Sequence, residues 1–349
     1  MNGDGEDRAD DGEDREGGFV FGPERKPASE SRAERSRDSD DAERRITVDL
    51  PDDDSGSASG PPERDPGVDP TGTGPDPGPN AVRNWTVLLI ALALSSFATG
   101  AFAYGTQDDL APVVGVVSLG VVFAALVPIA LYGDRRLVEA LAAAWAEHRR
   151  YTWFAAGLFG VGIVFGVLLM LAGINLLELI AELLEEELFP ELEDEEFELT
   201  ATFFIVNNTQ PFVLSIAGAL SLGLLTAFIM MFNGIVVGNV TAAIGGVVGI
   251  DYIVVGLAPH GVFELAALFI ASGVGFRLLY RFGERVLGRR DAFLTKPYVL
   301  RTVAFVVFAW LLLVLAAFVE AYVTPELLEL LFADRLEGLE EVDGPVTEP

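Results

Sequence analysis

The sequence predicts an all-α protein: a polytopic membrane helix bundle with about seven transmembrane helices and a disordered N-terminal tail. Two observations lead to this prediction. Apolar residues make up 51% of the 349 residues and gather in long runs, although the formal net charge is −29. Apolar spans joined to acidic, water-exposed segments account for both properties.

A helix needs about 20 apolar residues to cross a bilayer. Seven stretches reach or approach this length: 85–104, 111–132, 153–174, 212–232, 235–257, 262–280 and 299–322. The fifth and sixth are interrupted or flanked by polar residues, so the fifth could be broken or re-entrant. The first 84 residues are rich in Gly, Pro, Ser and charged residues, and this composition predicts a disordered, acidic tail.

Loop charges predict the orientation. Residues 133–150 contain four Arg and residues 277–296 contain six basic residues, whereas residues 175–200 contain none and many acids. Arg-rich loops stay in the cytoplasm. We therefore predict a cell-membrane protein with a cytoplasmic N-terminus and an extracytoplasmic C-terminus.

This topology predicts five regions in the chain. They are a cytoplasmic tail (1–84), two extra transmembrane helices (85–132), a cytoplasmic interfacial helix (133–152), a five-helix core (153–322) and an acidic extracytoplasmic tail (323–349). The interfacial helix is predicted because Leu137, Leu141, Ala144 and Trp145 recur at helical spacing between two Arg pairs. Residues 176–189 carry a similar apolar stripe and are predicted to form a helix along the outer surface.

The composition also restricts source and partners. Acidic residues exceed basic ones by 52 to 23, and the sequence pI is about 4.2, which indicates a halophilic source. This charge argues against nucleic acid as a partner. The expected partners are the lipid bilayer and other membrane proteins or further copies of the chain. Cysteine is absent, which excludes thiol chemistry, and no cofactor is predicted.

The segment around Pro259 contains the main candidate site. His260 and Glu264 are four residues apart, so they share one face of a helix. Pro259 suits the first position of that helix, and Gly261 follows the histidine. The pair could be structural, proton-linked or part of a metal site. Since Asp251 is the only nearby third ligand, no metal is predicted.

Other polar and small residues at membrane depth are candidates for structural or functional roles. Asn207 and Asn208 precede the fourth span, Asn233 follows it, and Asn239 lies inside the fifth. Buried amides must find partners, so these residues either cap and pair helices or line a hydrophilic cavity. Gly-x-x-x-Gly spacings, including Gly234 and Gly238, favour close helix packing.

The order of these elements resembles the stage II sporulation protein M family of integral membrane proteins, over about residues 151–322. The resemblance rests on Asn207-Asn208, on Asn233-Gly234 with Gly238, on Pro259-His260-Gly261-x-x-Glu264 and on a following Arg277. It implies a five-helix core of this family type and a membrane scaffold that works with cell-wall-degrading partners. It implies no catalytic function for the matching residues.

Three functions follow as hypotheses. The first is a non-enzymatic scaffold or subunit of a membrane complex. The alternative is a proton-linked secondary transporter or channel that uses Glu264 and His260. An intramembrane hydrolase is a remote third, because the chain lacks the zinc-helix, nucleophile-elbow and phosphate-loop motifs.

Overall fold

The computed structural model describes residue 75 and residues 78–133, 135–176, 178–179 and 199–343, with side chains described up to residue 335. The described segments form helices and no strand. The helices are α1 (Ala81–Thr106), α2 (Ala111–Tyr132), α3 (Arg136–Leu171), α5 (Ala201–Ala217), the 3-10 helix η3 (Gly218–Ser221), α6 (Leu224–Val247), α7 (Ile250–Val286), α8 (Lys296–Tyr322) and α9 (Thr324–Asp343).

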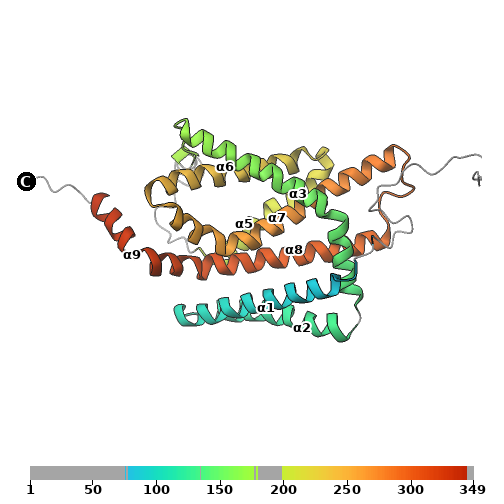
Figure 1. Ribbon diagram of the computed structural model, residues 1–349, viewed down its shortest axis with the longest axis horizontal. Helices are drawn as coiled ribbons and strands as arrows, with labels where there is room; N and C mark the ends of the chain where they lie inside the picture. Colours follow the sequence, from blue (N-terminus) through green and yellow to red (C-terminus); the bar gives the residue numbers. More distant parts are fainter. Residues whose placement is uncertain (1–74, 76–77, 134, 177, 180–198, 344–349) are drawn as a thin grey trace, which may run out of the picture. The chain divides into compact units, whose positions relative to one another are not determined.

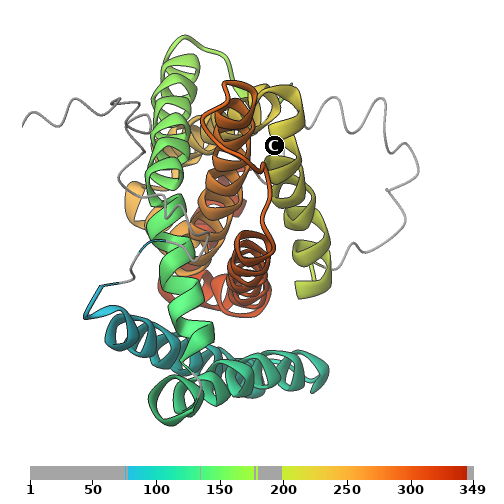
Figure 2. The same ribbon diagram turned by 90° about the vertical axis from the view of Figure 1, so that its right-hand side faces the viewer.

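Helix α8 runs through the middle of the bundle (Figure 1). The hairpin of α1 and α2 packs on one side of it, and α7, α5, α3 and α6 lie on the other, as the turned view also shows (Figure 2). The main apolar core joins α1, α2, α3, α7 and α8, and an edge-to-face contact between Trp85 and Phe308 closes it on the hairpin side. The centroids of these two rings are 5.1 Å apart.

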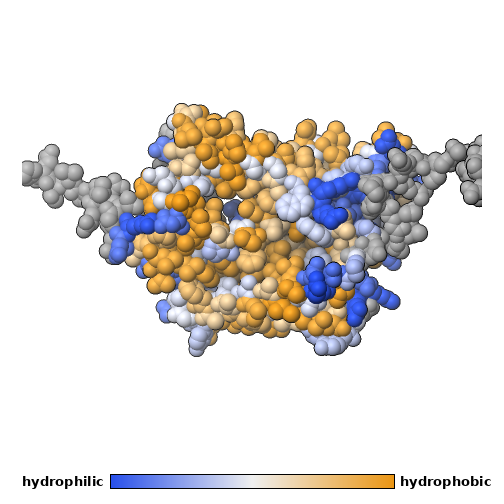
Figure 3. Space-filling model, in the orientation of Figure 1, coloured by the Kyte–Doolittle hydropathy of each residue, from blue (hydrophilic) through white to orange (hydrophobic). Residues whose placement is uncertain are grey.

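Seven helices of the described part are long and apolar enough to cross a membrane, which confirms the predicted fold class. Apolar residues cover the middle of the face in Figure 3, and hydrophilic residues gather toward its two ends. Such a band suits a lipid environment, where each backbone polar group must be bonded inside its own helix.

The predicted limits of the fourth to sixth spans were wrong. The fourth spans α5 and η3, and the chain then turns at Leu222 and Gly223 rather than at Asn233-Gly234. The next turn lies at Val248-Gly249, so α7 begins nine residues before Pro259. Pro259 is therefore inside a helix, and it does not start one.

Backbone geometry explains where these turns fall. Leu222, Gly223 and Gly249 have φ of 55°, 78° and 114°, a region that glycine adopts at little cost. Asn233 stays helical because its Nδ2 donates to the carbonyl oxygen of Ile229 in its own helix, at 2.8 Å. Neighbouring helices allow proline within a membrane helix, so Pro259 is no reliable breaker there.

The predicted interfacial helix is continuous with the third span. Helix α3 bends, and its first part runs across the ends of α1 and α2 before the helix turns along α6 (Figure 1). Leu141 and Ala144 in this first part are buried. Most of the predicted tail, most of the helix predicted at 176–189 and residues 344–349 lie outside the described residues. Residues Thr324–Asp343, predicted as part of the acidic tail, form helix α9.

Glycines bring α3 and α6 into direct backbone contact. Gly162 and Gly166 of α3 face Gly234 and Gly238 of α6. A Cβ at Gly166 would overlap the backbone oxygen of Ile235, and one at Gly238 would overlap that of Ile163. These two Gly-x-x-x-Gly pairs thus pack against each other within the chain.

This packing predicts that Gly166→Ala lowers the free energy of unfolding by about 1–3 kcal/mol, because the added methyl group must push two backbones apart. Gly160→Ala is the matched control on the same helix, since a Cβ there meets nothing within 4 Å. The control should be neutral or slightly stabilising, as alanine favours helix over glycine. Unfolding of both purified variants in detergent measures the difference, and equal stabilities would contradict the described packing.

Candidate functional site

Three ionisable side chains meet inside the bundle: His260 and Glu264 of α7 and Glu320 of α8. One ligand atom from each lies within 4.8 Å of the others. Glu264 is about 20 Å along the helix axis from the start of α7 and about 33 Å from its end, so the cluster lies within the span. We call these three residues the carboxylate–histidine cluster.

Both ring nitrogens of His260 face a polar group. Nδ1 lies 3.3 Å from the hydroxyl oxygen of Thr324, at the start of α9. That hydroxyl group also lies within donating distance, 3.2 Å, of the carbonyl oxygen of Val319. Nε2 faces Oε1 of Glu320 at 3.9 Å.

The carboxylates of the cluster have few partners. Among the described residues, no Lys or Arg forms an ion pair with Glu264 or Glu320. The Oε2 atom of Glu320 is buried without a hydrogen-bond partner, and its side chain is 23% exposed. Two neighbouring carboxylates repel each other, and a proton or a cation between them relieves that repulsion. The arrangement therefore has the chemistry of a proton-binding or cation-binding site.

A divalent metal ion is one cation that fits this donor set. Imidazole nitrogen and carboxylate oxygen are both zinc ligands, and three protein ligands leave the fourth position of a catalytic zinc site open. The third residue beside His260 and Glu264 is Glu320, and not Asp251 as the sequence spacing indicated. Asp251 instead pairs with Arg335 of α9 at 2.8 Å, on the surface.

The asparagines predicted as site residues are not part of this cluster. Asn239 is fully buried: its Oδ1 accepts from the backbone N–H of Leu176, and its Nδ2 donates to the carbonyl oxygens of Gly166 and Ile174. These bonds tie α6 to the end of α3. Asn207 and Asn208 lie inside α5, where Asn207 is exposed and Asn208 half-buried.

Pro259 and Gly261 flank His260 within α7, and a Cβ at Gly261 would meet open space. The sequence analysis missed Glu320 although the predicted seventh span contained it. An acid near the end of an otherwise apolar span is itself a signal, because ionisable residues inside a membrane are functional candidates.

A second charged cluster joins α3, α7 and α8 near the other end of the bundle. Glu147 Oε1 accepts hydrogen bonds from Arg277 at 3.1 Å and Arg281 at 3.2 Å, and its Oε2 accepts one from Arg301 at 2.9 Å. All four residues are buried. One carboxylate thus accepts from three guanidinium groups. We call these four residues the arginine cluster.

Sequence reasoning treated most of these arginines as loop charges. Arg277 was a candidate site residue, and Arg281 contributed to the predicted orientation, but Glu147 gave no separate signal. Their association could not be read from the chain because residues 147, 277 and 301 are far apart in sequence. Tyr298 packs against Arg281, whose guanidinium carbon lies 3.6 Å from the ring centroid.

The fold and the two clusters define the class: a multi-pass helical membrane protein with ionisable groups inside its bundle. Residues 154–325 match the family described as Stage II sporulation protein M. An uncharacterized protein of Methanocaldococcus jannaschii is 28% identical over 174 residues, which cover 49% of this chain and 91% of the relative. No solved structure matches the chain significantly.

The matched region covers α5, η3, α6, α7, α8 and the second half of α3. It includes the whole carboxylate–histidine cluster and Arg277, Arg281 and Arg301 of the arginine cluster. Glu147 lies seven residues before the match, and the whole of α1 and α2 also precedes it. The family core and the preceding part of α3 therefore share one buried ionic network.

The arginine cluster predicts that Glu147→Gln lowers the free energy of unfolding by about 3–5 kcal/mol, because three buried guanidinium groups lose their shared carboxylate. Glu139→Gln is the matched control, since Glu139 is exposed on the same helix. Denaturant unfolding of the purified variants measures the effect. If both variants unfold alike, Glu147 does not hold the cluster.

Proposed function

We propose that this chain is a proton-linked membrane transporter or channel, or the ion-binding subunit of one, with the carboxylate–histidine cluster as its ion site. The carrying observation is that Nε2 of His260 faces Oε1 of Glu320 at 3.9 Å, with Glu264 beside them, inside an apolar bundle. A proton taken up by this cluster relieves the repulsion between its two carboxylates.

Burial and depth support this proposal. His260 is 9% exposed and the side chain of Glu320 is 23% exposed, so the cluster lies largely inside the bundle. Intramembrane carboxylate and histidine groups form proton relays in pumps and transporters. Glu264, on the same face of α7 as His260, supplies a second carboxylate for the same proton.

The second candidate function is a non-enzymatic scaffold or subunit of a membrane complex. The family match favours it, since the matched description names a sporulation protein and no reaction. In this reading the carboxylate–histidine cluster holds α7, α8 and α9 together. Affinity purification from crosslinked native membranes distinguishes the two, because a scaffold brings a stoichiometric partner and a transporter comes alone or with copies of itself.

Glu320→Gln and Glu264→Gln test the proton site directly. In proteoliposomes with an internal pH indicator, we expect the wild-type chain to move protons under an imposed potential and both variants to lose this flux. Glu329→Gln is the control, as Glu329 is exposed on α9. Size-exclusion chromatography checks that each variant assembles normally.

A direct measurement of protonation accompanies the flux assay. The infrared band of a protonated carboxyl group should change with pH in the wild-type chain and should weaken in Glu320→Gln. Wild-type vesicles that move protons no faster than empty ones, together with an unchanged band in the variant, would refute the proposal. If the wild-type chain shows no proton flux and both variants fail to fold, the scaffold function is favoured instead.

We also propose that the protein lies in the cell membrane of a halophile, with a cytoplasmic N-terminus and an extracytoplasmic C-terminus. The support is the excess of acids and the placement of basic residues in alternate loops. Reporter fusions after Ala181 and after Arg290 test the orientation. The first reporter should be active outside and the second inside, and activity on one side for both would contradict it.

A further inference from the structure

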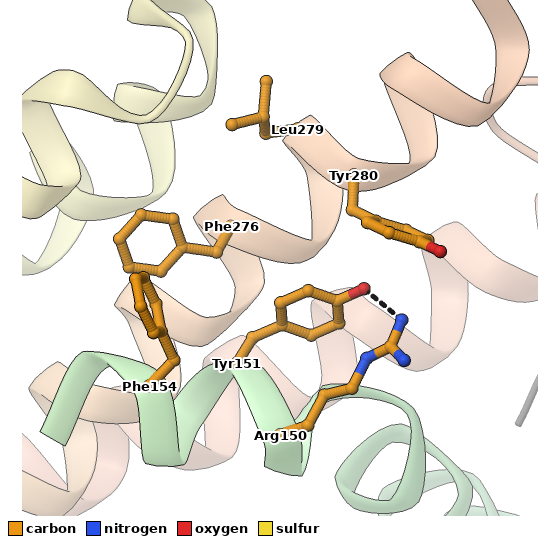
Figure 4. A pocket seen from close by; sticks show the side chains of 6 residues that line it. All are labelled: Arg150, Tyr151, Phe154, Phe276, Leu279 and Tyr280. Atoms are coloured by element: carbon orange, nitrogen blue, oxygen red, sulfur yellow. Dashed lines mark hydrogen bonds between the residues drawn. The ribbon is translucent and has the colours of Figure 1, made fainter. Parts of the chain in front are cut away.

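A hollow of about 440 Å³ opens between α3 and α7, beside the arginine cluster (Figure 4). Its lining divides into two levels. Arg150, Tyr151 and Tyr280 form one level, and Phe154, Phe276 and Leu279 form the other.

Position along the helices orders these two levels. Phe154 follows Tyr151 by about one turn of α3, and Phe276 precedes Tyr280 by about one turn of α7, so both phenylalanines lie nearer the middle of the apolar band. Their rings meet edge to face, with centroids 5.1 Å apart. The hollow thus has a charged and hydroxylic rim toward the bundle end and an apolar wall toward the bilayer interior.

The rim is electropositive. The guanidinium carbon of Arg150 lies 4.6 Å from the ring centroid of Tyr151 and 5.0 Å from that of Tyr280. Behind these rings lies Arg277, at 5.7 and 5.4 Å from the same centroids. The Nε atom of Arg277 is buried without a hydrogen-bond partner.

The hydroxyl group of Tyr151 can donate one further hydrogen bond. Its hydroxyl oxygen accepts hydrogen bonds from Arg150 and, at 3.2 Å, from Arg277. Both of these bonds use the oxygen as acceptor, which leaves its own O–H as a donor pointed away from them. A donor flanked by two arginines suits an anionic oxygen, since hydrogen bonds to charged groups are the stronger ones.

We propose that this hollow binds an anionic phospholipid of the leaflet at the Arg-rich end of the bundle. The phosphate group accepts from Tyr151 and pairs with Arg150, and one hydrocarbon chain lies along Phe154, Phe276 and Leu279. Charge complementarity selects an anionic headgroup, and the apolar wall selects a lipid over a free phosphate ion. This site is separate from the carboxylate–histidine cluster and does not depend on the function proposed for it.

The test compares three probes on the purified full chain in detergent: phosphatidylglycerol, phosphatidylcholine and inorganic phosphate. Native mass spectrometry counts the bound lipid, and thermal unfolding follows stabilisation. We expect phosphatidylglycerol to bind and to raise the unfolding temperature more than the other two. Equal effects of the two lipids would overturn the proposal, and so would equal stabilisation by inorganic phosphate.

Variants place the binding at this hollow. Arg150→Gln and Tyr151→Phe should each weaken phosphatidylglycerol binding roughly tenfold, the loss expected for one charge-assisted hydrogen bond. Arg149→Gln is the control, because Arg149 is exposed next to Arg150 and does not line the hollow. Arg150→Gln remains informative if Tyr151→Phe fails to fold, since Arg150 is exposed. Equal weakening by Arg149→Gln would show that surface charge alone attracts the lipid.

Discussion

The bundle depends on the ion pairs that the Glu147 carboxylate forms with three arginines. This carboxylate joins α3 to α7 and α8 by holding Arg277, Arg281 and Arg301, and buried guanidinium groups are tolerated in an apolar interior only when they are paired. His260 and Glu264 meet Glu320 about 20–30 Å farther along the same two helices. Both clusters therefore link α7 to α8.

The two clusters divide the ionic chemistry of the bundle. In the arginine cluster each oxygen of Glu147 accepts from at least one guanidinium group. In the carboxylate–histidine cluster no described Lys or Arg pairs with the two glutamates, and an oxygen of Glu320 has no donor. A satisfied network rigidifies a protein, whereas an unsatisfied one retains capacity to bind. This contrast is why the ion site is assigned to the second cluster and structural support to the first.

Local sequence patterns predicted the helical class and the number of spans, because apolar runs report directly on a lipid environment. They failed at the limits of α5, α6 and α7. There Pro259 and Asn233-Gly234 were interpreted as helix ends. Helix contacts in the bundle keep these residues helical. The real turns lie at glycines with positive φ. The pair of His260 and Glu264 followed from helical spacing alone. Glu320 and Glu147 did not, because their partners lie on other helices and no alternation within one helix records that.

The placement of Thr324 gives the carboxylate–histidine cluster a connection to the aqueous surface. Its hydroxyl group contacts Nδ1 of His260, yet it belongs to the first turn of α9. Farther along α9, Arg335 bonds Asp251 and the carbonyl oxygen of Val248 at the beginning of α7, where water and salt have access. Dissolved ions weaken such an exposed pair. One helix thus carries both the hydrogen-bond partner of a buried imidazole and an ion pair that dissolved salt reaches.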